Sequence, residues 1–272
     1  MALSKEQVAK LYIAMFDRAP DGEGLEYWYN EATTNNLDAT TLANNMVAAA
    51  KQYSDVYPAY ADVTSESNVK TIIESIYSTL LNKTYEDDSK GIDYWVNEVV
   101  KNGKTIGEVA NAIIYVANQV AAGNFEGNLA VYKDDAKAKA AAKAFENKAK
   151  VALDTADSIK TFDIDGDGKF DADDKNAFNE IVKVVTDNEK TIDTAKDKIK
   201  DYTPKSFDLS TAKDEIVGTD AANTFKAVVS SLNGEATLNS GDKIDGKGGV
   251  DTLDLIWKEV LLVLETMDIL KI

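Results

Sequence analysis

Two stretches of this chain are similar to each other, and this internal similarity is the feature that most constrains its fold. Residues 11–28 read LYIAMFDRAPDGEGLEYW, and residues 76–95 read IYSTLLNKTYEDDSKGIDYW, with two extra residues in the second loop. The similarity continues into LAN at 42–44 and VAN at 109–111. A repeat of this kind indicates supersecondary units that bury their apolar faces against a neighbouring copy.

Each copy is expected to form a helix, an acidic loop and two further helices. Apolar side chains recur at helical spacing in the first copy and predict one buried stripe, made of Val8, Leu11, Tyr12, Met15 and Phe16. We therefore predict a helical repeat domain over residues 1–124, with units at about 4–57 and 68–124. The predicted fold class is mainly α, followed by a small β segment.

Local signals mark the ends of the first helix. Ser4 and Gln7 have the spacing of a capping box at its start. Pro20 and Gly22 are expected to stop it, because both residues interrupt helical sequences. The acidic loop of the first copy should therefore lie between two short helices.

A Tyr-Trp pair ends the similar stretch in both copies, at Tyr27-Trp28 and Tyr94-Trp95. Two interpretations are open. Large aromatic side chains at equivalent positions are usually the core anchors of each unit, with Trp28 facing inward. Alternatively, exposed Tyr and Trp rings stack on sugar rings. The first interpretation is favoured from the sequence.

A second helical segment is predicted over residues 125–204. Its longest pattern places one apolar face at helical spacing, made of Ala138, Ala141, Ala142, Phe145, Ala149 and Ala152. Lysines flank this face on both sides. They are expected to be solvated, with their stems along the apolar edge, although a basic stripe can also bind phosphate or an acidic polysaccharide.

The loop DIDGDGKFDADD, residues 163–174, has the spacing of an EF-hand-type calcium loop. Such a loop places oxygen ligands at positions 1, 3, 5, 7, 9 and 12 and a glycine at position 6. These positions hold Asp163, Asp165, Asp167, the Lys169 carbonyl, Asp171 and Asp174, with Gly168 at the turn. The last ligand is usually glutamate. The shorter Asp174 should weaken binding, and Phe170 should pin the loop to the core.

Three roles are open to this loop. It can be an acidic turn without an ion, although several carboxylates in one turn repel one another unless a cation joins them. A calcium sensor opens a helix pair and often exposes a Met-rich groove, but no Met lies near this loop. We therefore expect calcium in a structural role.

After Pro204 the sequence changes to short β-branched segments separated by Gly, Asn and Asp, which predicts strands with tight turns over residues 205–272. GKGGVDTLD, residues 246–254, resembles the calcium-binding nonapeptide GGxGxDxUx of RTX proteins, with Lys247 at the second glycine. GTDAANTF at 218–225 is a more degenerate version, with Asn223 at the aspartate. The candidate ligands of a second calcium site are Asp242, Asp245, Gly246, Gly248 and Asp251. A glycine-rich hairpin turn is the alternative.

Composition excludes several classes of function. The chain has 272 residues and a net charge of −17, so nucleic acid is not an expected partner and cations are. It has no Cys and no His, which excludes disulfides, thiolate zinc sites and Ser-His-Asp catalysis. No apolar stretch is long enough for a transmembrane segment, and the N-terminus lacks the pattern of a cleavable secretory signal. We expect a protein that is not an enzyme.

The paired Gly-[Leu/Ile]-x-Tyr-Trp stretches resemble the N-terminal region of S-layer proteins of Gram-negative bacteria. The segments EIVGTDAANTF, TLNSGDKIDGKGGVDTLDL and ETMDI resemble the start of the lattice-forming region of such proteins. These RTX-like proteins leave the cell by type I secretion. The resemblance is weakest over residues 125–202.

This resemblance implies an extracellular protein whose helical domain anchors to cell-surface lipopolysaccharide or another surface glycan. The β region would self-associate into a calcium-dependent lattice in a longer protein, of which this chain would be a fragment. Export would use an uncleaved C-terminal signal. An RTX-type adhesin that binds a glycan or protein is the alternative. A secreted hydrolase with paired carboxylates has no motif in its favour.

Overall fold

The computed structural model describes residues 3–231 and 234–258. It is mainly helical with a small β segment toward the C-terminus, as the sequence predicts, and the described strands of that segment pair in parallel. The end of the expected β segment, including ETMDI, lies outside the described residues. The chain divides into two compact units, which we call the helical unit (1–164 and 168–202) and the β unit (165–167 and 203–272).

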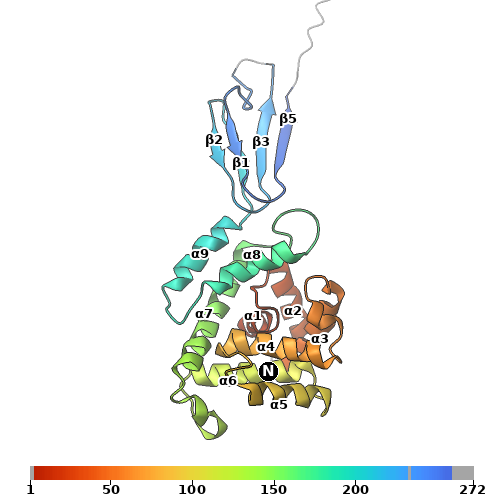
Figure 1. Cartoon of the computed structure of the whole chain (residues 1–272). Helices are drawn as coiled ribbons and strands as arrows, with labels where there is room; N and C mark the ends of the chain where they lie inside the picture. The colour runs from red at the N-terminus through yellow and green to blue at the C-terminus, as the bar shows by residue number, and fades with distance from the viewer. Residues whose placement is uncertain (1–2, 232–233, 259–272) are drawn as a thin grey trace, which may run out of the picture. The chain divides into compact units, whose positions relative to one another are not determined.

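The helical unit contains a series of α-helices joined by short connections (Figure 1). They are α1 (Lys5–Phe16), α2 (Gly22–Thr34), α3 (Ala39–Ala50), α4 (Glu66–Leu81), α5 (Ser89–Val100), α6 (Ile106–Ala121), α7 (Ala136–Ser158), α8 (Ala172–Lys183) and α9 (Thr191–Asp201). Short 3₁₀ helices occur at η1 (Lys51–Tyr53), η2 (Pro58–Ala61) and η3 (Gly127–Tyr132).

Helix α1 lies in the core of the helical unit, and its residues 8–16 are all buried. The predicted capping box is confirmed. Ser4 Oγ accepts a hydrogen bond from Gln7 N at 3.2 Å, and Gln7 Oε1 accepts one from Ser4 N at 2.9 Å. The expected stop at Pro20 and Gly22 is wrong, because the helix ends at Phe16. Asp17 then adopts a left-handed conformation with φ 50°, and that residue breaks the helical path.

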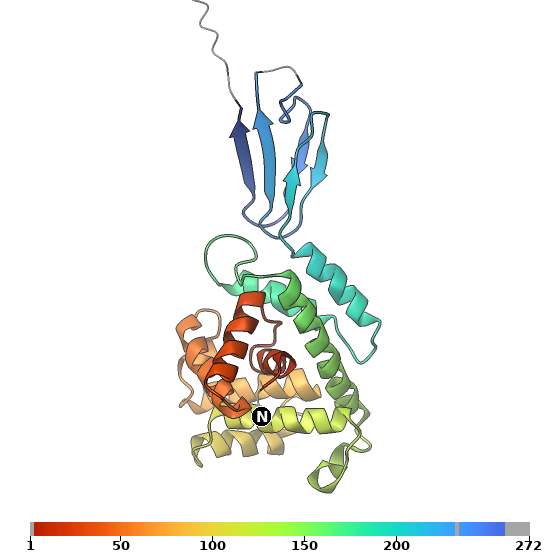
Figure 2. The same cartoon turned by 180° about the vertical axis from the view of Figure 1, so that it is seen from behind.

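Helix α7 connects the later part of the helical unit to the earlier helices. It packs against α1, α4 and α6, and Figures 1 and 2 show it at one side of these helices. Its predicted apolar face is buried except for Ala141, which is half-buried. Phe145 is fully buried in this interface. The two helical segments expected from the sequence, 1–124 and 125–204, therefore form one compact unit up to Tyr202.

The described strands of the β unit pair in parallel in two sheets. They are β1 (Ser206–Asp208), β2 (Glu215–Val217), β3 (Thr224–Val229), β4 (Lys243–Asp245) and β5 (Thr252–Trp257). One sheet has the order β1-β3-β5, and the other pairs β2 with β4. Successive strands thus alternate between the sheets, so the chain winds as a coil.

The coil has a regular period. β1, β2 and β3 begin at Ser206, Glu215 and Thr224, so each strand starts nine positions after the previous one. The same step of nine separates Lys243 from Thr252. Between Thr224 and Lys243 the step is ten residues longer. The alternative of a glycine-rich hairpin turn at residues 246–254 is wrong, because a hairpin joins antiparallel neighbours, whereas β4 and β5 belong to different sheets and the described strands pair in parallel.

The core of the β unit is small. Leu209, Phe225 and Ala227 are buried between the turns of the coil. Phe207 stacks on Phe225 with a ring-centroid distance of 5.2 Å, and these two residues are direct partners in the β1–β3 register. Stacked identical positions are the way in which a coiled repeat extends its core from one turn to the next.

Candidate metal site and aromatic pocket

The loop 163–174 connects α7 to α8 and folds around its own aspartates. Asp163 Oδ2 accepts a hydrogen bond from Gly168 N at 2.9 Å, and Asp165 Oδ1 accepts one from Asp167 N at 3.1 Å. Gly166 and Gly168 have φ angles of 79° and 87°, which residues with a side chain rarely adopt. The alternation of Asp and Gly therefore lets the chain turn sharply.

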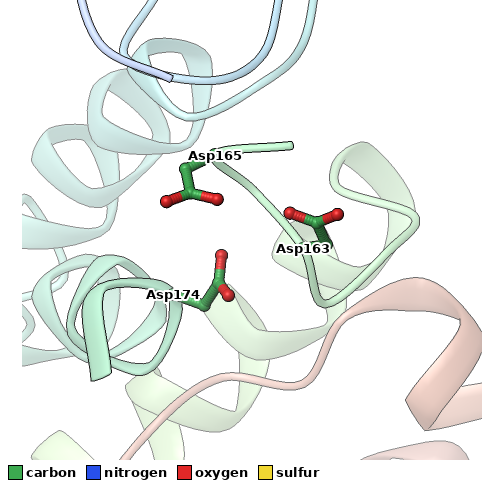
Figure 3. Close-up of side chains that lie close together, drawn as sticks. All are labelled: Asp163, Asp165 and Asp174. Carbon is green, nitrogen blue, oxygen red and sulfur yellow. The ribbon is translucent and has the colours of Figure 1, made fainter. Parts of the chain in front are cut away.

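Three aspartates of the loop come together. Asp163, Asp165 and Asp174 each offer one carboxylate oxygen, and these oxygens lie within 4.8 Å of one another (Figure 3). Asp174 comes from the first turn of α8 and is only 1% exposed. Carboxylates at this spacing repel one another unless a cation joins them, and this cluster could hold a metal ion.

Hydrogen bonds hold the buried carboxylate of Asp174 in position. Its Oδ1 accepts from Ile164 N at 2.7 Å, and its Oδ2 accepts from Asp171 N at 3.2 Å. The last candidate ligand is thereby tied to the second and ninth positions of the loop. This arrangement closes the loop on itself and keeps Asp174 beside Asp163 and Asp165.

The other predicted ligands of this loop lie outside the cluster of three. Asp171 forms the N-cap of α8, and its Oδ1 accepts hydrogen bonds from Asp173 N and Asp174 N. Asp167 and Lys169 are exposed. The structure thus gathers three of the predicted ligands and gives Asp171 a helix-capping role, which the sequence analysis did not recognise.

Phe170 fixes the loop to the helical unit, as predicted. Its ring makes aromatic contacts with Tyr53, Tyr57 and Phe162, at centroid distances of 5.6, 6.1 and 6.0 Å. The guanidinium of Arg18 lies 4.9 Å from the centre of the same ring. One side chain of the loop therefore takes part in an aromatic and cationic cluster.

A cavity of about 410 Å³ opens beside this cluster. Its lining includes Arg18, Asp21, Tyr27, Trp28, Tyr53 and Phe170. We call this cavity the aromatic pocket. Its volume lies within the range of small-molecule sites in proteins, which are about 300–1,000 Å³.

The Tyr-Trp pairs are not the core anchors expected from the sequence. Tyr27 is 60% exposed and Tyr94 is 54% exposed, while both tryptophans are half-buried. In each pair the Tyr ring meets the Trp ring edge-on, at 4.9 and 5.0 Å. Leu25 and Ile92, two positions earlier, fill the core instead. The helical spacing places the aliphatic residue inward and the tyrosine outward.

The second candidate calcium site lies at two stacked turns of the β unit, residues 218–223 and 246–251. Asn223 Nδ2 lies within hydrogen-bond distance of four oxygens: Thr219 O at 3.0 Å, Ala221 O at 2.6 Å, Gly246 O at 3.2 Å and Asp251 Oδ1 at 2.9 Å. Carbonyls and a carboxylate that converge in this way resemble the environment of a cation. Here the amide of Asn223 takes that central place.

The remaining candidates for this second site are used in local turns. Asp245 Oδ1 accepts from Lys247 N at 3.0 Å, and the Asp242 carboxylate accepts from Asp214 N and Asn239 N. These backbone hydrogen bonds lower the pKa of Asp242. Gly246 and Gly248 lie in the turn that connects β4 to β5. In the part of the chain that the structure describes, only Asp163, Asp165 and Asp174 form a cluster of carboxylates that could hold a metal ion.

No protein-family model, curated protein or solved structure matches this chain. Among the described residues, no helix has the length and apolar character needed to cross a membrane.

Proposed function

We propose that this chain is part of a structural surface-layer protein that works outside the cell. In this proposal the helical unit anchors to lipopolysaccharide, and the β unit begins a calcium-dependent lattice. The role is structural rather than catalytic. The observation that carries the proposal is the parallel coil of the β unit with its nine-residue step.

A nine-residue step links this coil to the RTX nonapeptide. That nonapeptide is the repeat unit of a parallel β-helix that binds calcium. The described strands follow this scheme, with GKGGVD forming the turn before β5. The pairing of Ser206 with Thr224 spans two nonapeptides, as one full turn of such a coil requires. The geometry therefore supports the RTX-like character that the sequence suggested.

The carboxylates of the loop 163–174 support calcium as the cation. All of the candidate ligands there are oxygens, which calcium prefers. A cation that binds only the folded chain stabilises it by RT ln(1 + [L]/Kd). Extracellular calcium fills sites with dissociation constants of about 10⁻⁴–10⁻³ M, whereas cytosolic calcium does not. Folding would therefore be favoured after export.

An RTX-type adhesin remains the second candidate, and one observation favours it. The exposed Tyr27 and Tyr94 provide aromatic surface that fits glycans of many sources. An array of immobilised glycans separates the two functions. Binding restricted to the cell's own lipopolysaccharide supports the surface-layer protein, and binding to host-type glycans alone supports the adhesin.

The test is binding of the chain to purified smooth lipopolysaccharide, measured with millimolar calcium and with a chelator. We expect binding in calcium and weaker binding in the chelator, because the loop 163–174 is then without its cation. Rough lipopolysaccharide, which lacks the long polysaccharide, is the control. An absence of binding in both conditions contradicts the anchoring role.

A further inference from the structure

The aromatic pocket combines an apolar wall with fixed polar groups. Tyr27, Trp28, Tyr53, Phe162 and Phe170 supply the wall. Several of these rings stay largely open to solvent, since Tyr53 is 45% exposed and Tyr27 is 60% exposed. Exposed aromatic surface that gathers around a hollow marks a binding site more often than singly scattered apolar residues do.

Arg18 supplies a polar group to the lining of the pocket. It is only 6% exposed, and its Nε donates to Tyr57 Oη at 2.9 Å while its Nη1 donates to Ala19 O at 2.8 Å. The guanidinium also lies between aromatic rings, 5.1 Å from Tyr12 and 5.2 Å from Phe178. A guanidinium has five N–H donors in a rigid fork, so one that is held in this way is preorganised for a ligand oxygen.

Asp21 adds a buried acceptor near the guanidinium. One of its carboxylate oxygens accepts from Gly24 N at 2.7 Å, and the other lies 3.8 Å from Arg18 Nη1. The pocket therefore presents donors and an acceptor beside flat apolar rings. A pyranose ring has the complementary surface, with an apolar C–H face and a rim of hydroxyl groups.

We propose that the aromatic pocket binds a saccharide unit, through stacking on Tyr27, Trp28 and Tyr53 and hydrogen bonds to Arg18 and Asp21. This inference rests on the proposed anchoring function, because it takes the polysaccharide of lipopolysaccharide as the source of that saccharide. In this proposal the pocket recognises the sugar part of lipopolysaccharide and not its lipid part.

The second Tyr-Trp pair provides a matched control. Tyr94 meets Trp95 at 5.0 Å, as Tyr27 meets Trp28 at 4.9 Å, and the two tyrosines have similar exposure. The lining of the aromatic pocket includes Tyr27 but not Tyr94. Replacing either tyrosine with alanine therefore removes a similar amount of exposed aromatic surface, and only the replacement of Tyr27 alters the pocket.

The experiment titrates the whole chain with lipid-free polysaccharide released from smooth lipopolysaccharide of the producing strain. Calorimetry compares the wild-type chain with Tyr27→Ala, Tyr53→Ala and the control Tyr94→Ala, and thermal melts verify that each variant folds. Vesicles of lipid A and phospholipid, without polysaccharide, form a second arm. We expect at least a tenfold loss of affinity for Tyr27→Ala and Tyr53→Ala, and less than a twofold change for Tyr94→Ala.

The outcomes separate this inference from the proposed function. If Tyr27→Ala and Tyr53→Ala both bind the polysaccharide with wild-type affinity, the aromatic pocket is not the binding site, although the anchoring function stands. An equal loss in Tyr27→Ala and Tyr94→Ala also overturns it, since the effect then follows exposed aromatic surface in general. If the chain binds only the vesicles, the saccharide is not its ligand, although attachment to lipopolysaccharide stands. No binding by the wild-type chain to any probe overturns both.

Discussion

Gly24 leaves room for the hydroxyl of Tyr12, because a β-carbon at position 24 would lie 2.7 Å from that oxygen. The same relationship holds between Gly91 and Tyr77, again at 2.7 Å. Burial raises the pKa of both tyrosines, and a hydrogen bond from the tryptophan four residues after each glycine acts in the opposite direction. The glycine of the Gly-x-x-Tyr-Trp motif is thus required by close packing.

Replacing this glycine should destabilise the helical unit. In Gly24→Ala the new methyl group collides with the buried Tyr12 hydroxyl, and overpacking of this kind costs about 1–3 kcal/mol. Alanine is the better helix former by about 1 kcal/mol, which offsets part of that cost. We expect a net loss of up to about 2 kcal/mol in the free energy of unfolding, measured by denaturant titration.

A second substitution tests the cause. Tyr12→Phe removes the hydroxyl, so Gly24→Ala should cost less in the Tyr12→Phe background than in the wild-type chain. Equal costs in the two backgrounds would mean that the hydroxyl is not what the glycine accommodates.

We predict that Asn223 makes the two stacked turns 218–223 and 246–251 of the β unit independent of calcium. In Asn223→Asp an oxygen replaces the amide nitrogen, and it then faces the carbonyls of Thr219 and Gly246 and the carboxylate of Asp251. Leaving these groups without a donor should cost on the order of 3 kcal/mol in a chelator. Millimolar calcium should restore most of that loss by filling the centre of the cluster.

Thermal melts of the chain with and without calcium measure this effect. The control is Ser240→Asp, which adds the same charge at an exposed position of the β unit. If Asn223→Asp and Ser240→Asp respond alike to calcium, Asn223 does not stand in the place of an ion.

Lys148 offers a test of pH dependence in the helical unit. Burial lowers the pKa of its ammonium group, and the carboxylate of Asp17 opposes this only in part. The folded chain therefore binds fewer protons than the unfolded chain between the lowered pKa and 10.5. The contribution of this group to the free energy of unfolding therefore rises with pH across that window. At pH 7 the charged form of Lys148 destabilises the folded chain.

Removing the charge should remove that cost. We expect Lys148→Met to raise the melting temperature by about 2–4 °C at pH 7. The gain should shrink toward pH 10, where the wild-type lysine is increasingly neutral. Lys143→Met, at an exposed position of the same helix, should change the melting temperature little at either pH. A gain from Lys148→Met that does not depend on pH would contradict the role of its charge.

The helices were predictable because their local signals agree with their packing. The stripe from Val8 to Phe16, the capping box at Ser4 and the alanine face around Phe145 all fix a periodicity that tertiary contacts preserve. The end of α1 was not predictable. It depends on a left-handed Asp17, and aspartate adopts this conformation only occasionally, so its presence alone does not mark a helix end.

The β unit was less predictable from the sequence than the helices. Its short β-branched segments predicted strands correctly, but alternation within a strand does not distinguish parallel from antiparallel pairing. The step of nine between Ser206, Glu215 and Thr224 was present in the sequence and would have indicated the coil. The extra ten residues before Lys243 hide this period from a search for regular repeats.

The candidate sites were predictable in part. Spacing predicted six ligand positions in the loop 163–174, because a loop of this kind is local in sequence, and the structure gathers three of them, Asp163, Asp165 and Asp174. The aromatic pocket was not predicted, since its wall combines Tyr27, Tyr53 and Phe170, which only the fold brings together. A helical projection of residues 22–34 would have placed Tyr27 on the face opposite Leu25 and so indicated its exposure.

The central claim is that calcium binds the loop 163–174 and stabilises the folded chain. The most direct measurement is a calcium titration by calorimetry, combined with thermal melts, on the wild-type chain, Asp163→Asn and Asp173→Asn. Both variants lose one negative charge from the same stretch, but Asp173 lies outside the cluster of three carboxylates. The account predicts wild-type stabilisation of about 2.7 kcal/mol at a calcium concentration one hundred times Kd. It further predicts that Asp173→Asn retains this response and that Asp163→Asn loses most of it. A wild-type melt unchanged by millimolar calcium, or an equal response in the two variants, would contradict it.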